Sequence, residues 1–163
     1  GQDAAMSVST SIGGATLNLS HSPKGGSNTE GGVTADFNAY SVKMPVGPAE
    51  VYVGAESYDD DTNDVIAYGA KATFNGVMVA YEYADYDSGA SATGMAIKYG
   101  MGDMTVGVES QQEESAAGVD TLDQTIVFAK YDLGGGVEVF AESNSDDATG
   151  GADENIIGIG YSF

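Results

Sequence analysis

The last eight residues, IIGIGYSF at positions 156–163, carry the strongest fold signal in the chain. Every second residue counted back from the end is large and apolar, as in Phe163, Tyr161 and Ile159, whereas the residues between them are mostly small. A period of two is typical of a β-strand whose two faces meet different surroundings. Because the strand also ends the chain on an aromatic residue, it is typical of the closing strand of an outer-membrane β-barrel. We expect its apolar face to meet lipid and its small face to meet the lumen.

The composition fits one domain that crosses a membrane with strands. The chain has 163 residues, 24 glycines and no cysteine, so residues 1–163 are expected to form a single domain without disulfides or thiolate metal sites. No segment approaches the roughly 18–20 uninterrupted apolar residues of a spanning helix. In lipid every backbone polar group must be paired, so a spanning chain without such helices must form a barrel.

The charge is strongly acidic. Twenty-five carboxylates stand against five lysines and no arginine, for a net charge of −20. A nucleic-acid partner is therefore excluded, because phosphate binding needs cationic side chains. The same charge favours cations near the protein. The alternative is an acidic, solvated surface with no particular ligand.

Alternating segments recur along the whole sequence, with turn residues between them. We predict eleven antiparallel strands, at Met6–Ile12, Ala15–Ser20, Val33–Met44, Glu50–Tyr58, Val65–Phe74, Val77–Asp85, Ala92–Gly100, Met104–Ser110, Gln124–Tyr131, Val137–Ser143 and Asn155–Phe163.

The connections alternate between short and long. The short ones are expected at Gly13-Gly14, Pro45–Pro48, Asn75-Gly76, Met101–Asp103 and Asp132–Gly136, and the long ones at His21–Gly32, Asp59–Asp64, Tyr86–Ser91, Gln111–Asp123 and Asn144–Glu154. Asn-Gly between two apolar runs is a strong hairpin signal. Short periplasmic turns and longer outer loops are typical of bacterial transmembrane barrels. The long connections hold most acidic residues, whereas four of the five lysines precede a short turn.

The charged residues of the strands fall on the small-residue face. On Val77–Asp85, for example, Val79 and Tyr81 alternate with Ala80 and Glu82. A charge in hydrocarbon is costly, so these residues are predicted to line a pore, where opposed charges set a cation preference. The predicted pore-lining residues are Lys43, Glu50, Glu56, Lys71, Glu82, Lys98, Glu109, Lys130, Glu138 and Glu142. The alternative is neutral pairing inside a narrow or plugged lumen.

Other motifs give weaker signals. Asp59, Asp60, Asp61 and Asp64 form an acidic run that would bind calcium through carboxylate oxygens, although a solvated loop tip is the more common explanation. No other cofactor is expected. One histidine, His21, and no phosphate-binding loop give no catalytic constellation, so we do not expect an enzyme.

Residues 65–163 resemble the C-terminal half of alphaproteobacterial general-diffusion porins. The resemblance is carried by Ala67-Tyr68-Gly69-Ala70, Val79-Ala80-Tyr81-Glu82-Tyr83, Lys130-Tyr131-Asp132-Leu133-Gly134-Gly135-Gly136 and the final strand ending in Phe163. It implies part of a sixteen-stranded barrel, a homotrimer in the outer membrane, and passive diffusion of small hydrophilic solutes. The chain lacks arginine and a long constriction loop, so no constriction residues are transferred from that family.

Strand direction predicts that the wall is incomplete. With eleven alternating strands the first and last run the same way, whereas bacterial barrels usually have even numbers. We expect about five further strands upstream, or a second polypeptide, to complete the barrel. The competing explanation is a complete ten- or twelve-stranded barrel with one strand misassigned.

Three functions follow from these features. The first is a diffusion channel that prefers cations. The second is a structural or adhesive surface barrel with a filled lumen and acidic loops that bind calcium or partners. The third is a soluble secreted β-protein that binds calcium. Tyr161 and Phe163 are predicted to act as an assembly signal, so deletion of Phe163 should impair membrane assembly more than conductance.

Overall fold

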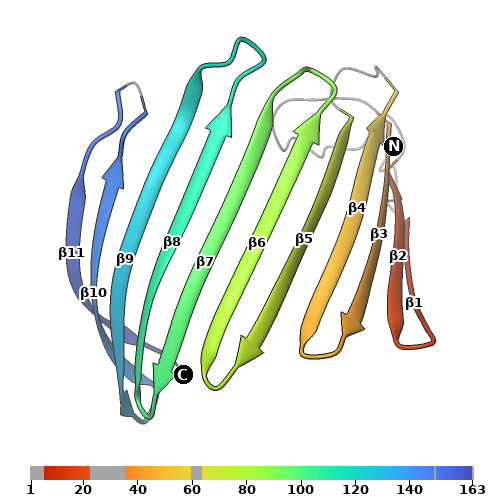
Figure 1. Ribbon diagram of the computed structural model, residues 1–163. Helices are drawn as coiled ribbons and strands as arrows, with labels where there is room; N and C mark the ends of the chain where they lie inside the picture. Colours follow the sequence, from red (N-terminus) through yellow and green to blue (C-terminus); the bar gives the residue numbers. More distant parts are fainter. Residues whose placement is uncertain (1–5, 23–35, 60–63, 149, 163) are drawn as a thin grey trace, which may run out of the picture.

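The computed structural model describes residues 6–22, 36–59, 64–148 and 150–162, which form one antiparallel sheet of eleven strands (Figure 1). Each strand pairs with its neighbour in sequence, so the order in the sheet is β1 to β11 without a crossover. The strands are β1 (Met6–Ile12), β2 (Ala15–Ser22), β3 (Phe37–Val46), β4 (Ala49–Tyr58), β5 (Val65–Phe74), β6 (Val77–Tyr86), β7 (Ser91–Met101), β8 (Met104–Glu114), β9 (Asp120–Gly134), β10 (Val137–Asp146) and β11 (Glu154–Tyr161).

The eleven predicted strands are confirmed, but several connections were predicted too long. The stretch 111–123 is mostly strand, because β8 continues to Glu114 and β9 begins at Asp120. The β6–β7 connection likewise shrinks to residues 87–90. Figure 1 shows the β8–β9 hairpin extending above its neighbours. Both faces of the hairpin tip are exposed to water. The sequence of the tip therefore lacks the alternation of apolar and polar residues by which strands are recognised.

Smaller differences occur at other strand ends. β2 continues to Ser22, β9 to Gly134 and β10 to Asp146, each two or three residues beyond its predicted end and into a predicted connection. β3 runs through Pro45, so the turn before β4 contains only Gly47 and Pro48. Of the predicted strand at residues 33–44, residues 33–35 lie outside the described part of the chain. β11 ends at Tyr161, although the backbone N–H of Ser162 still donates to the Gly136 carbonyl at 2.7 Å.

The Asn-Gly turn between β5 and β6 has the predicted conformation. Asn75 and Gly76 have φ values of 49° and 81°. Both residues tolerate positive φ, as a type I′ hairpin turn requires. The tight turn and the continuous register from Phe74↔Val77 to Val65↔Tyr86 fix which side chains share a face.

One face of the sheet, here called the apolar face, carries large hydrophobic residues that are exposed and not packed into a protein core. It includes Val79 at 49% exposure, Ile97 at 55% and Ile159 at 58%. Among the described residues, Phe128 is the one hydrophobic side chain below 9% exposure. An apolar area this large is typical of a surface that contacts another protein or a membrane. Six tyrosines share this face, namely Tyr68, Tyr81, Tyr83, Tyr99, Tyr131 and Tyr161.

The sheet is open in the described part of the chain, where β1 pairs only with β2 and β11 only with β10. The ribbon is nevertheless curved, as a segment of a barrel wall would be (Figure 1). No helix among the described residues is long and apolar enough to span a membrane.

Candidate functional site

The opposite face, here called the polar face, carries all ten residues predicted to line a pore. Directly paired residues of adjacent strands share a face. One row of partners therefore connects Glu50, Lys71, Ala80, Ala96 and Glu109 across β4 to β8. A second row connects Met78, Lys98, Gly107, Phe128 and Glu142 across β6 to β10. Lys43, Glu56, Glu82, Lys130 and Glu138 alternate onto the same face.

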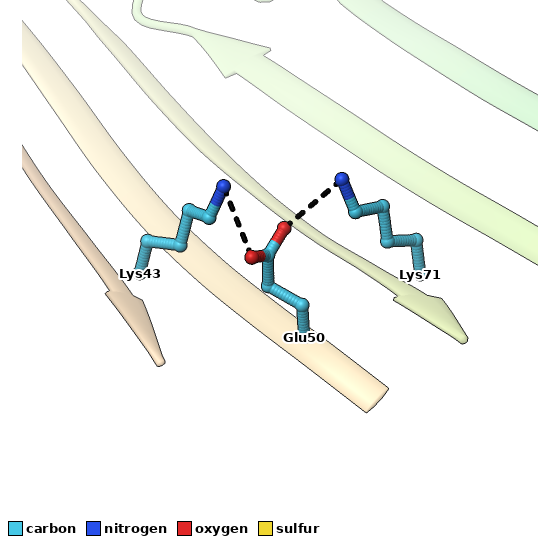
Figure 2. Close-up of polar contacts among 3 residues, drawn as sticks. All are labelled: Lys43, Glu50 and Lys71. Carbon is cyan, nitrogen blue, oxygen red and sulfur yellow. Dashed lines mark ion pairs between the residues drawn. The ribbon is translucent and has the colours of Figure 1, made fainter. Parts of the chain in front are cut away.

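Three of these residues form an ion-pair triad near the short turns (Figure 2). Glu50 accepts from Lys43 Nζ at 3.0 Å through Oε2 and from Lys71 Nζ at 3.1 Å through Oε1. The three side chains come from adjacent strands, so strand register brings them together. The lysine side chains remain about half exposed. Exposed pairs contribute little stability, so their main effect is the position of charge in front of the wall.

A second cluster surrounds Phe128 on β9. Lys98 Nζ lies 2.5 Å from Glu109 Oε1 and 5.5 Å from the centroid of the Phe128 ring. Lys130 Nζ lies 5.8 Å from the same centroid. Both distances suit cation–π attraction. In the described part of the chain, Lys130 makes no ion pair with a carboxylate.

Glu82 has a tyrosine as its partner. The Tyr52 hydroxyl donates to Glu82 Oε2 at 2.9 Å, across the intervening strand β5. Glu56 similarly accepts from the Tyr58 hydroxyl at 3.0 Å. A neutral donor orients a carboxylate without cancelling its charge. Within the described residues, Glu56, Glu82, Glu138 and Glu142 form no ion pair with a lysine, so their charges are not locally neutralised.

The polar face is hollowed between these groups. A cavity of about 500 Å³ is lined by six of the predicted residues, namely Lys43, Glu50, Lys71, Glu82, Lys98 and Glu109. Polar and charged lining of this kind suits water and hydrated ions. No group of three metal-ligating residues occurs in the hollow, as far as the chain is described.

The predicted calcium site is only partly described. Asp60 and Asp61 lie outside the described residues. Asp64 Oδ1 accepts from the backbone N–H of Tyr58 at 2.7 Å, and the Asp59 N–H donates to the Asp36 carbonyl at 3.1 Å. These contacts tie the two ends of the β4–β5 connection to the strands. Calcium binding there stays a prediction.

Of the two residues predicted to form the assembly signal, the structure describes one. Tyr161 pairs with Val137 and lies exposed on the apolar face. Phe163 lies outside the described residues. Its role in assembly stays a prediction.

Sequence reasoning missed two aromatic residues of the polar face. Tyr52 orients Glu82, and Phe128 underlies two lysines. Strand pairing held a signal for both residues. Tyr52 pairs directly with Gly69 and Phe128 with Gly107, and a glycine leaves space for a ring to lie along the sheet. Which neighbour a side chain contacts depends on its rotamer, which alternation does not reveal.

A family model for Gram-negative porins matches residues 1–163, the whole chain. The chain belongs to the Gram-negative porin family. Porins of this family are outer-membrane channels, not enzymes, so the chain is placed in the bacterial outer membrane. No match was found among curated proteins.

Solved porin structures share the fold of this porin chain. A porin refined at 1.8 Å resolution superposes with a TM-score of 0.81 at 21% identity, over 96% of this chain and 60% of that one. Salmonella typhi OmpF in complex with daunomycin gives 0.79 at 15% identity, over 98% and 61%. A triple mutant of Rhodopseudomonas blastica porin gives 0.75 at 17% identity, over 98% and 55%. The chain thus spans little more than half the length of these porins. The similarity confirms the predicted porin-type barrel wall.

Proposed function

We propose that this chain forms part of the wall of a water-filled outer-membrane channel, through which small hydrophilic solutes and ions diffuse passively. One observation carries the proposal: a continuous sheet has exposed hydrophobic residues on one face and all ten predicted lining charges on the other. Lipid on one side and water on the other satisfy both faces. Such a channel lowers a barrier to diffusion and catalyses no reaction.

We propose further that the channel leans toward cations. The ten lining residues are six glutamates and four lysines, a net charge of −2. Four of the glutamates have no lysine partner in the described residues, whereas three of the four lysines are paired. A wall that presents unneutralised carboxylates attracts cations and repels anions.

The assembled channel needs strands beyond those described. β1 and β11 each leave one edge unpaired in the described sheet. In hydrocarbon an unpaired edge costs several kcal/mol per group. We propose that further strands of the same protein or a second polypeptide close the barrel. Assembly into a homotrimer, as in the resembling porins, is part of this proposal.

Single-channel recording in planar lipid bilayers tests the function. We expect discrete, long-lived conductance steps and a reversal potential on the cation side in a salt gradient. A structural or adhesive barrel with a filled lumen would insert without conducting. Stable insertion without any conductance would therefore reject the channel and leave the alternative.

A further inference from the structure

Five side chains of the polar face lie over a glycine of an adjacent strand. Each side chain and its glycine are direct cross-strand partners. A Cβ atom added to the glycine would lie 2.5–2.8 Å from that side chain at four of the five sites, closer than real Cβ contacts come, and 3.0 Å from it at Gly160. The pairs are Tyr52 over Gly69, Glu82 over Gly94, Phe128 over Gly107, Phe140 over Gly158 and Glu138 over Gly160.

This arrangement keeps the side chains against the wall. A side chain normally stands roughly perpendicular to its sheet. Here the bare backbone of the neighbouring glycine lets a ring or carboxylate stem lie along the sheet instead. Aromatic residues are known to cover cross-strand glycines in this way. Three of the five are aromatic rings, which would project farthest if they stood upright.

We propose that these glycines set the free width of the aqueous lumen. The inference rests on the proposed function, because only in a channel is the space before the polar face a conduction path. Each glycine acts as a positioning residue through the side chain above it. Replacing it by a residue with a Cβ lifts that side chain off the wall and narrows the path.

Gly158 offers the cleanest test. The three atoms nearest to a Cβ there all belong to the Phe140 ring, the nearest at 2.5 Å. At Gly69 and Gly107, backbone carbonyls of Tyr81 and Ile97 also lie within 2.6 and 2.9 Å, so substitution would distort the strands themselves. Gly158→Ala thus moves a side chain and spares the backbone.

Gly100 is the matched control. It lies on the polar face of β7, pairs with Thr105, and has nothing within 4 Å of an added Cβ. We expect Gly158→Ala to lower single-channel conductance by more than the spread between unsubstituted channels, and Gly100→Ala to leave it unchanged.

A double-mutant cycle separates ring displacement from general disturbance. Phe140→Ala removes the ring, so Gly158→Ala should cause no further loss of conductance in that background. An equal loss with and without the ring would overturn the proposal. So would a Gly158→Ala channel that conducts like the unsubstituted one.

A second readout does not depend on conduction. The chain contains no tryptophan, so Phe140→Trp introduces a single tryptophan, which red-edge excitation selects over the tyrosines. Acrylamide quenching of the membrane-inserted protein should increase when Gly158→Ala is added. If the protein never conducts but quenching increases, the proposed function fails while ring positioning by Gly158 stands. Unchanged quenching overturns ring positioning whether or not the protein conducts.

Discussion

At the scale of single residues, Glu82 is the lining carboxylate that we expect to contribute most to the ion preference of the channel. It lines the 500 Å³ hollow, has the Tyr52 hydroxyl at 2.9 Å, and makes no ion pair with the described lysines. Its neighbours Glu50 and Glu109 lie within 3.1 Å of lysine ammonium groups. Glu82 should therefore contribute more to the field in front of the wall than either paired glutamate.

Glu82→Gln is expected to shift the reversal potential in a KCl gradient toward zero, because one unneutralised charge is lost. The shift should be larger near 0.1 M than near 1 M salt, since the Debye length falls from about 10 Å to about 3 Å. Tyr52→Phe is the matched control, because it removes the hydrogen bond and keeps the charge. A cation preference that Glu82→Gln leaves unaltered would contradict this role.

Sequence alternation was sufficient to place the charged residues on a common face. It could not predict their partners, because Lys43 and Lys71 share Glu50 while Lys130 lies over Phe128. Those contacts depend on stagger between strands and on rotamers, neither of which has a sequence period. The Tyr52–Glu82 hydrogen bond joins β4 to β6 across Gly69 of β5. The sequence pattern of a hairpin relates only adjacent strands, so it could not predict this contact.

At the scale of elements, the two faces of a single strand meet different environments, lipid on the apolar face and water on the polar face. On β7, Ile97 is 55% exposed on the apolar face, and its neighbour Ala96 lies between Ala80 and Glu109 on the polar face. Ile97→Lys should destabilise the membrane-inserted fold by about 2–4 kcal/mol if it lies near the bilayer midplane. Ala96→Lys should cost far less, because the ammonium group meets water and Glu109.

Urea unfolding from lipid vesicles measures both variants. The unfolding midpoint should fall for Ile97→Lys and stay near that of the unsubstituted protein for Ala96→Lys. Equal midpoints, or the reverse order, would be incompatible with the assignment of the faces.

The turn between β5 and β6 should tolerate substitution poorly. Gly76 has φ of 81°, and an added Cβ would lie 3.3 Å from the Gly100 carbonyl oxygen. A left-handed conformation costs an L-residue roughly 1–2 kcal/mol, so Gly76→Ala should lower the unfolding midpoint. Gly100→Ala, at a site without positive φ and with open space, should not. Equal stability of the two variants would argue against a strained turn.

Strand existence was easier to predict than strand ends. β5 was predicted to its full length and β6 to within one residue, because a strand that faces hydrocarbon needs alternation over about ten residues. The polar ends of β8 and β9, beyond Ser110 and before Gln124, meet water on both faces and lose that signal. Only pairing such as Gln112↔Asp123 and Glu113↔Leu122 reveals them as strands.

At the scale of the whole molecule, the described residues form a curved wall without a hydrophobic core. Eleven strands follow one another in sequence order, and TM-scores of 0.74–0.81 match porin barrels over 55–61% of their length. A soluble sheet protein would fold a second layer onto the apolar face. A porin wall needs none, because lipid covers that face.

A single-cysteine scan along residues 77–84 of β6 tests this division of lipid from water. The chain has no cysteine, so each variant carries one thiol. In the membrane-inserted protein, cysteines at 78, 80, 82 and 84 should react with a water-soluble maleimide. Cysteines at 77, 79, 81 and 83 should be protected from this reagent. If they are labelled with a fluorophore before membrane insertion, nitroxides attached to lipid tails should quench its fluorescence. Reversed alternation, or uniform reactivity along the strand, would contradict a wall with lipid on one face and water on the other.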